Sequence, residues 1–317
     1  MAIFDSIWDD LKYSLRAGNM VTKLAVINFA VFVTAQLAHL FVWVAKGFDS
    51  DTTLQAYELG LRWFCIPSDL STLLWRPWTL VTHMFLHDVL LWHLFNNLTG
   101  LYIFGNIVGD LVGDRRVLPI YLLGGLAGGA VFAVSAQFAP DVIGDYALGA
   151  SAAVMALCGA ALILAPDYRV RLLLLGEVKV KYIVLVLVLL DIVAISYKYN
   201  SGGPVAHIAG FALGCLFMYR LRDGHDWSDW VNVFLDKIVG LFSAQKRSKQ
   251  TTTKRPKQTS SVAKTGAGTS QGNPASDRED RSMQERLDEI LSKIKASGYD
   301  SLTPEEKEFL YETSRKL

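Results

Sequence analysis

The sequence predicts an all-α protein that crosses a lipid bilayer several times, and three observations support this fold class. Of the 317 residues, 51% are hydrophobic and only 19% are charged, whereas about a quarter are charged in an ordinary soluble domain. Charged residues are scarce between positions 24 and 220, where apolar runs of spanning length recur. A polar C-terminal tail follows, so the average composition hides a strongly apolar body.

The first 22 residues predict an amphipathic helix that lies in the membrane surface. Between Ile3 and Tyr13, apolar and acidic residues alternate at helical spacing, a pattern typical of interfacial helices. The stretch lacks the short apolar core of a cleavable signal peptide. We therefore expect a surface helix here rather than a leader sequence.

Residues 23–222 contain six segments that we expect to cross the membrane, because a spanning helix needs about 20 mostly apolar residues. They are Leu24–Val44, Leu94–Val112, Val117–Phe138, Leu148–Ala165, Tyr182–Tyr197 and Val205–Leu221. The second and fourth are rich in Gly, Ala and Asn, which favours burial inside a bundle where backbones approach closely. The sequence therefore predicts a six-helix membrane domain.

Lys and Arg residues are concentrated on one side of these spans. That side carries Lys12, Arg16, Lys23, Arg115, Arg116, Arg169, Arg171, Lys179, Lys181, Arg220 and Arg222, and the other carries Lys46, Arg62, Arg76 and Lys198. Because basic residues favour the cytoplasmic side, we expect both termini in the cytoplasm of a multi-pass protein in a bacterial inner membrane. The fourth and sixth spans then both begin at the outer side.

The remaining segments predict surface structures. The stretch Gly47 to His87 is rich in Trp, Tyr and Leu, residues that suit the outer membrane boundary. Residues 223–242 predict an amphipathic helix at the cytoplasmic surface. Residues 243–280 are rich in Lys, Thr, Ser, Gln and Gly, and predict a disordered linker. Residues 281–317 predict a cytoplasmic helical hairpin, with a capping signature at Thr303 to Glu306.

Ser151 and His207 are the candidate catalytic residues. Each lies near the start of an apolar span, and the expected orientation places both at similar depth in the outer leaflet. Polar groups at that depth are costly, which makes them functional candidates. A serine hydroxyl becomes a strong nucleophile when a base takes its proton, and histidine suits that role at neutral pH.

Several nearby residues predict the rest of a site. His93 and Asn97 are four residues apart and share one helix face, so both could donate to an oxyanion together with the Ser151 amide. Gly149 leaves room for a substrate, and Gly210 lies on the helical face of His207 and would let the sixth span press against the fourth.

No acidic partner for His207 is evident from the sequence, and Asp191 in the fifth span receives no role. We therefore expect a Ser-His dyad, with Met155 as a packing surface for the imidazole. His83, His87 and His93 could be read as metal ligands, but no acidic ligand follows them at a suitable spacing. We expect neither a metal nor a cofactor.

These motifs resemble the rhomboid family of intramembrane serine proteases. The resemblance covers roughly Gly47 to Leu221. It rests on His-x-x-x-Asn at the second span, Gly-x-Ser at the fourth and Ala-His-x-x-Gly-x-x-x-Gly at the sixth. It implies a rhomboid-like six-helix bundle and cleavage of transmembrane substrates. It also implies Ser151 as nucleophile, His207 as base, and Asn97, His93 and the Ser151 amide as the oxyanion hole.

Two other functions stay open at this point. A non-catalytic relative would hold membrane clients without cutting them, and would tend to lack Ser151 or His207. A small transporter would show repeated or broken helices in matching halves, and no repeat is evident. The expected partners are transmembrane substrates, the lipid bilayer and a cytoplasmic protein that binds residues 281–317. The net charge of +1 argues against nucleic acid.

Overall fold

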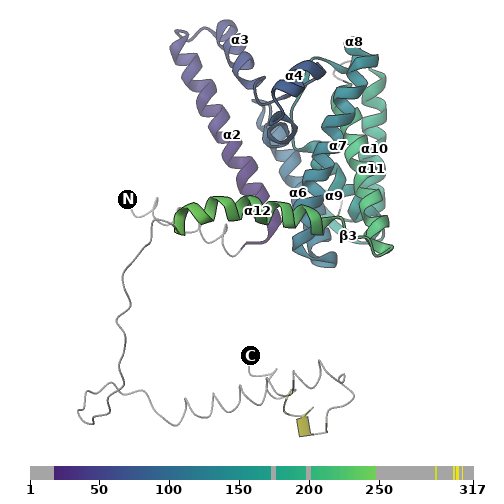
Figure 1. Ribbon diagram of the computed structural model, residues 1–317. Coiled ribbons are helices and arrows are strands. Elements are labelled where there is room, and N and C mark those ends of the chain that lie inside the picture. The colour runs from purple at the N-terminus through teal and green to yellow at the C-terminus, as the bar shows by residue number, and fades with distance from the viewer. Residues whose placement is uncertain are drawn as a thin grey trace, which may run out of the picture. The chain divides into compact units, whose positions relative to one another are not determined.

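The computed structural model describes residues 18–172, 176–197 and 201–247, together with a few residues near the C-terminus (Figure 1). The chain divides into two units, residues 1–251 and 252–317. The surface helix expected before residue 18 and the linker beyond residue 247 lie outside the described residues. The described part is mostly helical, as the sequence predicts.

Six long helices correspond to the six expected spans. They are α2 (Met20–Ala45), α6 (Leu91–Val112), α7 (Val117–Phe138), α9 (Ser151–Leu164), α10 (Val180–Ser196) and α11 (Gly202–Arg222). By length and composition, three stretches could cross a membrane: Met20–Ala45, Asp114–Phe138 and Gly202–Arg222. The helix α9 has 14 residues and α10 has 17, and polar residues and glycines dilute the hydropathy of α6. Among the described residues, three spans are thus supported, and six stays a prediction.

The centre of the bundle is α9, which packs against α6, α7 and α11. Ten of its 14 residues are buried, in one unbroken run from Ala152 to Ala161. Glycines make this close packing possible: a Cβ at Gly210 or Gly214 of α11 would collide with the backbone carbonyl groups of α9. The expected pressing of the sixth span against the fourth is therefore confirmed.

Two other helices pack more loosely. In Figure 1, the C-terminal end of α2 lies away from the other long helices. The N-terminal end is held to the bundle by a hydrogen bond from the Met20 amide to Asp114 Oδ1 at 2.7 Å. In α10 only Val180 and Val184 are buried. Both residues lie at the start of the helix, so most of α10 exposes apolar side chains.

The connection between α2 and α6 folds into short elements at one end of the bundle. These are α3 (Ser50–Leu61), β1 (Ile66–Pro67), α4 (Leu70–Trp75), α5 (Thr79–Thr82) and the 3₁₀ turn η1 (His83–Phe85). The strand β1 pairs antiparallel with β2 (Tyr146–Ala147), which follows α8 (Pro140–Ile143). The Arg76 guanidinium stacks over the Trp63 ring at 3.8 Å. These contacts fix the chain around the start of α9.

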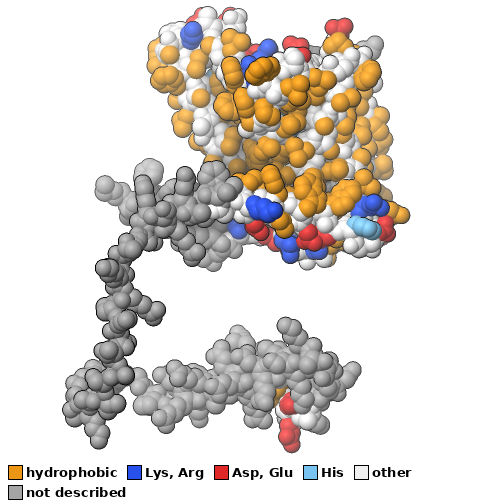
Figure 2. Space-filling model, in the orientation of Figure 1, with side chains coloured by type: hydrophobic (Ala, Val, Ile, Leu, Met, Phe, Trp, Pro, Cys, Tyr) orange, Lys and Arg blue, Asp and Glu red, His pale blue; other side chains and the backbone are white. Residues whose placement is uncertain are grey.

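The opposite end carries the 3₁₀ turn η2 (Asp114–Arg116), the hairpin β3 (Arg169–Leu172) with β4 (Gly176–Lys179), and α12 (Ser228–Arg247). Figure 2 shows blue and red side chains gathered at this end and orange side chains over the walls. Two ion pairs hold the start of α12 and the turn before it: Arg116 to Asp226 at 2.7 Å and Arg115 to Asp229 at 3.0 Å. The helix runs past residue 242, so the start of the expected linker is helical.

Near the C-terminus, two hydrogen bonds form the predicted helix cap. The Thr303 amide donates to Glu306 Oε2 at 2.7 Å, and the Glu306 amide donates to Thr303 Oγ1 at 3.3 Å. This reciprocal pair is a capping box, which satisfies two amides that have no partner within the helix. The capping signature is confirmed, while the hairpin as a whole lies largely outside the described residues.

Candidate active site

Ser151 is the first residue of α9, and the chain before it makes a sharp turn. Gly149 has φ of +134°, a conformation that residues with a side chain rarely adopt. The Gly149 amide donates to the His83 carbonyl at 2.9 Å, so the connection before α6 anchors this turn. Amides in the first turn of a helix have no partner within it, and the oxyanion role of the Ser151 amide stays a prediction.

His207 lies in the second turn of α11 and faces Ser151. The distance between His207 Nε2 and Ser151 Oγ is 2.6 Å, within hydrogen-bonding range. Gly210, one turn further along α11, lets the two helices meet at the Ala152 carbonyl. The structure therefore brings together the two candidate residues, which are far apart in the sequence.

Asp191 of α10 is a third member of this arrangement, and the sequence analysis missed it. Its Oδ1 atom lies 2.8 Å from His207 Nδ1, so the expectation that His207 has no acidic partner is wrong. A signal was present: Asp191 lies about one and a half turns before the end of α10, and His207 about one and a half turns after the start of α11. Consecutive antiparallel helices place such residues at equal depth.

These contacts define the proton positions on His207. An ionised carboxylate only accepts hydrogen bonds, so the Nδ1 atom of His207 carries the hydrogen that points to Asp191. The Nε2 atom is then an acceptor for the hydroxyl proton of Ser151. This is the tautomer that a general base needs to take a proton from the serine.

His93 and Gly149 border a small space beside Ser151. The point where a Cβ of residue 149 would lie is 3.1 Å from His93 Nε2 and 3.3 Å from Ser151 Oγ. The Asp88 amide donates to His93 Nδ1 at 3.2 Å, so the hydrogen of the neutral ring is on Nε2. A donor and a nucleophile thus face the same space, which glycine leaves empty.

The remaining predicted site residues lie around this space in the fold. The Asn97 amide nitrogen donates to the His93 carbonyl at 2.9 Å, which uses one of its two N–H groups. Asn97 is buried on the same face of α6 as His93. Met155 is buried in the main core one turn after Ser151, and its contact with the imidazole stays a prediction.

The histidines of the preceding connection lie close to the site. The His87 ring packs edge-on against the His93 ring, with centroids 5.3 Å apart. Burial, together with the neighbouring His93, lowers the pKa of His87 to about 4, so this ring is neutral at physiological pH. His83 Nδ1 donates to the Thr79 carbonyl at 2.7 Å. Over the described ranges, no three His, Cys, Asp or Glu residues are placed to hold a metal ion.

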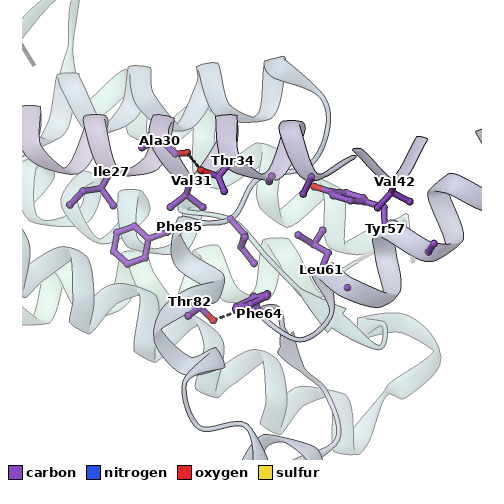
Figure 3. A pocket seen from close by; sticks show the side chains of 15 residues that line it. Ile27, Ala30, Val31, Thr34, Val42, Tyr57, Leu61, Phe64, Thr82 and Phe85 are labelled. Carbon is purple, nitrogen blue, oxygen red and sulfur yellow. Dashed lines mark hydrogen bonds between the residues drawn. The ribbon is translucent and has the colours of Figure 1, made fainter. Parts of the chain in front are cut away.

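A separate cavity of about 700 Å³ lies between α2 and the α3–α5 connection (Figure 3). Its lining is almost entirely apolar and includes Val31 and Phe85. The hydroxyl groups of its two threonines donate to backbone carbonyls, Thr34 to Ala30 and Thr82 to Phe64. The cavity does not include Ser151, so it is distinct from the site described above.

Comparison with known proteins finds a family match within the chain. Residues 74–224 match the Rhomboid domain. These residues form a rhomboid domain. It covers α6 through α11 and therefore contains every residue of the candidate site. Residues 277–316 match a separate family of unknown function, DUF6576.

A curated relative carries the same family name. The chain is 30% identical over 162 residues to RHOMBOID-like protein 12, mitochondrial, from Arabidopsis thaliana, and the match covers 47% of this chain and 48% of the relative. The chain thus spans about half the length of the curated relative. A membrane protein is consistent with this match and with the three described stretches that are long and apolar enough to cross a membrane.

Proposed function

We propose that the rhomboid domain is an intramembrane serine endopeptidase that cleaves transmembrane segments of membrane proteins near the outer leaflet. The observation that carries this proposal is the 2.6 Å contact between Ser151 Oγ and His207 Nε2. A nucleophile bonded to a base of the correct tautomer is the arrangement that acyl transfer needs.

In the proposed reaction, Ser151 Oγ attacks the carbonyl carbon of the scissile peptide and gives its proton to His207 Nε2. The C–N bond then breaks, and His207 returns the proton to the leaving amine. Water attacks the resulting ester with His207 again as base, which releases the acid product and restores the serine. The steps need no cofactor.

The proposed oxyanion donors are His93 Nε2–H, the second N–H of Asn97 and the Ser151 amide. The space beside Gly149 supports this assignment, since both His93 Nε2 and Ser151 Oγ border it. Donors aimed at the developing charge act strongly where water is excluded. A carbonyl oxygen placed beside Gly149 would receive these hydrogen bonds as its carbon meets the hydroxyl.

We further propose six spans with both termini in the cytoplasm, in a bacterial inner membrane. Basic residues support this orientation, since η2, the β3–β4 hairpin and the end of α11 carry Lys and Arg at one end of the bundle. Substrates would enter from the lipid, and small or helix-breaking residues would lower the cost of unwinding them. The segment 281–317 would bind a cytoplasmic protein.

The alternative is a non-catalytic relative that binds membrane clients. Binding alone would need no hydrogen bond between a serine and a histidine, nor a space bordered by both the nucleophile and a donor. Because both features occur together in one site, catalysis is the better-supported function. A transporter is disfavoured because the domain shows no helices broken at matching positions among the described spans.

The test uses the purified full-length chain in liposomes with a reporter transmembrane substrate that carries Gly and Ala residues near its outer boundary. We expect cleavage by the wild type and none by Ser151→Ala or His207→Ala. A fluorophosphonate should label Ser151 and require His207. Equal cleavage by wild type and Ser151→Ala would refute the protease, and client capture without cleavage by either would favour the binding protein.

A further inference from the structure

We propose that Asp191 is a positioning residue for His207, so that the site works as a Ser-His-Asp arrangement rather than as a dyad. This inference rests on the proposed function and concerns how the base is prepared. Its structural basis is that both ring nitrogens of His207 are engaged. Nδ1 contacts Asp191 on α10 at 2.8 Å, and Nε2 contacts Ser151 on α9 at 2.6 Å.

The location of Asp191 calls for an explanation. The neighbouring residues of α10 are apolar, and large side chains such as Leu190 and Ile192 are exposed on the surface of the bundle. A carboxylate on a spanning segment is costly in lipid and is found paired or functional. The Asp191 side chain is only 14% exposed, because it turns from the lipid toward α11. Over the described ranges, its hydrogen bond goes to His207.

A purely structural role explains this pair poorly. Replacing a buried ion pair by apolar residues of similar size is often neutral or stabilising, because desolvation offsets the attraction. A helix that needed only to pack against α11 would be served by an apolar side chain, such as the neighbouring Leu190 and Ile192 carry. The carboxylate therefore matters chiefly through what it does to the imidazole.

Two effects on His207 follow from the geometry. First, the acceptor at Nδ1 keeps the hydrogen there and leaves Nε2 free to accept from Ser151. Second, the negative charge stabilises the imidazolium that forms when the serine loses its proton.

The experiment measures fluorophosphonate labelling of Ser151 in the full-length chain, which needs no natural substrate. The variants are Asp191→Leu and Asp191→Glu. Leucine removes the carboxylate and is compatible with an apolar environment, whereas glutamate keeps the carboxylate on a side chain one methylene group longer. Ser196→Ala is the matched control, since it removes a hydrogen bond from the same helix to the Val193 carbonyl, away from His207. Reporter cleavage and thermal unfolding are measured in parallel.

We expect Asp191→Leu to unfold at the wild-type temperature or above it while the labelling rate and kcat fall between 10- and 10⁴-fold (~10⁴ is the loss on disabling the carboxylate of a serine-protease triad). KM should not change. Asp191→Glu should recover part of the rate, and Ser196→Ala should match the wild type.

The result that would overturn the inference is an Asp191→Leu protein with the wild-type labelling rate and kcat, or one that loses activity only in proportion to folded protein. In both cases labelling would still depend on Ser151, so the proposed protease would stand. If Ser151→Ala were labelled and cleaved the reporter like the wild type, the proposed function itself would fail, and the role of Asp191 with it.

Discussion

The helices α9 and α10 each supply one partner of His207, but the bundle holds them in different ways. In α9 ten of 14 residues are buried, whereas in α10 two of 17 are. Close packing determines the position of Ser151 through many contacts. Asp191 lies beyond the buried turns of its helix, and its hydrogen bond to His207 ties that part of α10 to α11. The proposed nucleophile therefore lies on a tightly packed helix, while the carboxylate proposed to orient His207 lies on a loosely packed one.

The largest effect should come from separating α11 from α9. In Gly210→Val, the added side chain collides with the Ala152 carbonyl, which is backbone and cannot move aside. We expect loss of the folded bundle or a drop in the unfolding temperature of 10 °C or more, because overpacking typically costs about 1–3 kcal/mol, and more against backbone. Thermal unfolding followed by circular dichroism checks this.

Gly203→Ala is the matched control for that variant. It lies on the same helix, and a Cβ there meets no atom within 4 Å. Alanine also favours the helix by up to about 1 kcal/mol. We expect an unchanged or slightly higher unfolding temperature, and equal destabilisation by both variants would contradict the role of close contact between α9 and α11.

The next largest effect should come from filling the space beside Ser151. In Gly149→Ala, the methyl group enters the space that His93 Nε2 and Ser151 Oγ border. We expect the reporter cleavage rate to fall at least about 100-fold, comparable to the loss of an oxyanion donor, in a protein that still folds. Fluorophosphonate labelling should fall in parallel.

Gly144→Ala separates this blocking effect from backbone strain. Gly144 also has a positive φ, of +93°, but a Cβ there meets nothing within 4 Å. Both variants carry strain of about 1–3 kcal/mol, while only Gly149→Ala obstructs the site. Equal losses of cleavage in the two variants would show that strain, and not the space beside Ser151, limits activity.

Much of this arrangement could be predicted from the sequence, because the residues concerned lie in strong local patterns. Apolar run lengths predicted the six long helices. The expected alternation of spans placed Ser151 and His207 at equal depth, and the two side chains do meet, while the orientation inferred from basic residues stays a prediction. Small residues at helical spacing predicted the contact at Gly210. Each inference uses information within a few turns of one helix, together with the rule that consecutive spans alternate in direction.

The parts that could not be predicted depend on contacts between distant segments. The pairing of Ile66 with Ala147 involves strands of two residues, which are too short to show a periodic pattern. Asp191 sits in an otherwise unbroken apolar run, so no motif distinguishes a base-orienting carboxylate from an isolated polar residue. Whether Asp191 reaches His207 depends on how α10 is rotated about its own axis. That rotation is determined by packing against α11, which the sequence of α10 alone does not show.

A loss of similar size, without backbone strain, should follow from removing the proposed oxyanion donor on α6. In Asn97→Ala, the carbonyl of His93 loses the amide that donates to it at 2.9 Å, and the developing oxyanion loses one donor. We expect kcat to fall about 100- to 1000-fold with little change in KM, since the donor acts mainly in the transition state. A raised KM with unchanged kcat would instead assign Asn97 to substrate binding.

The smallest effect should come from trimming the lipid-facing side of α10. Leu190 is 60% exposed, so in Leu190→Ala surrounding lipid fills the vacated volume and no cavity forms. We expect a change in the free energy of unfolding below about 0.5 kcal/mol and wild-type cleavage. The matched variant Leu157→Ala removes the same atoms from a fully buried position on α9 and should cost about 2–5 kcal/mol. A comparable loss of stability at both positions would mean that α10 is packed as tightly as α9. The proposed difference between the helices that carry Ser151 and Asp191 would then be wrong.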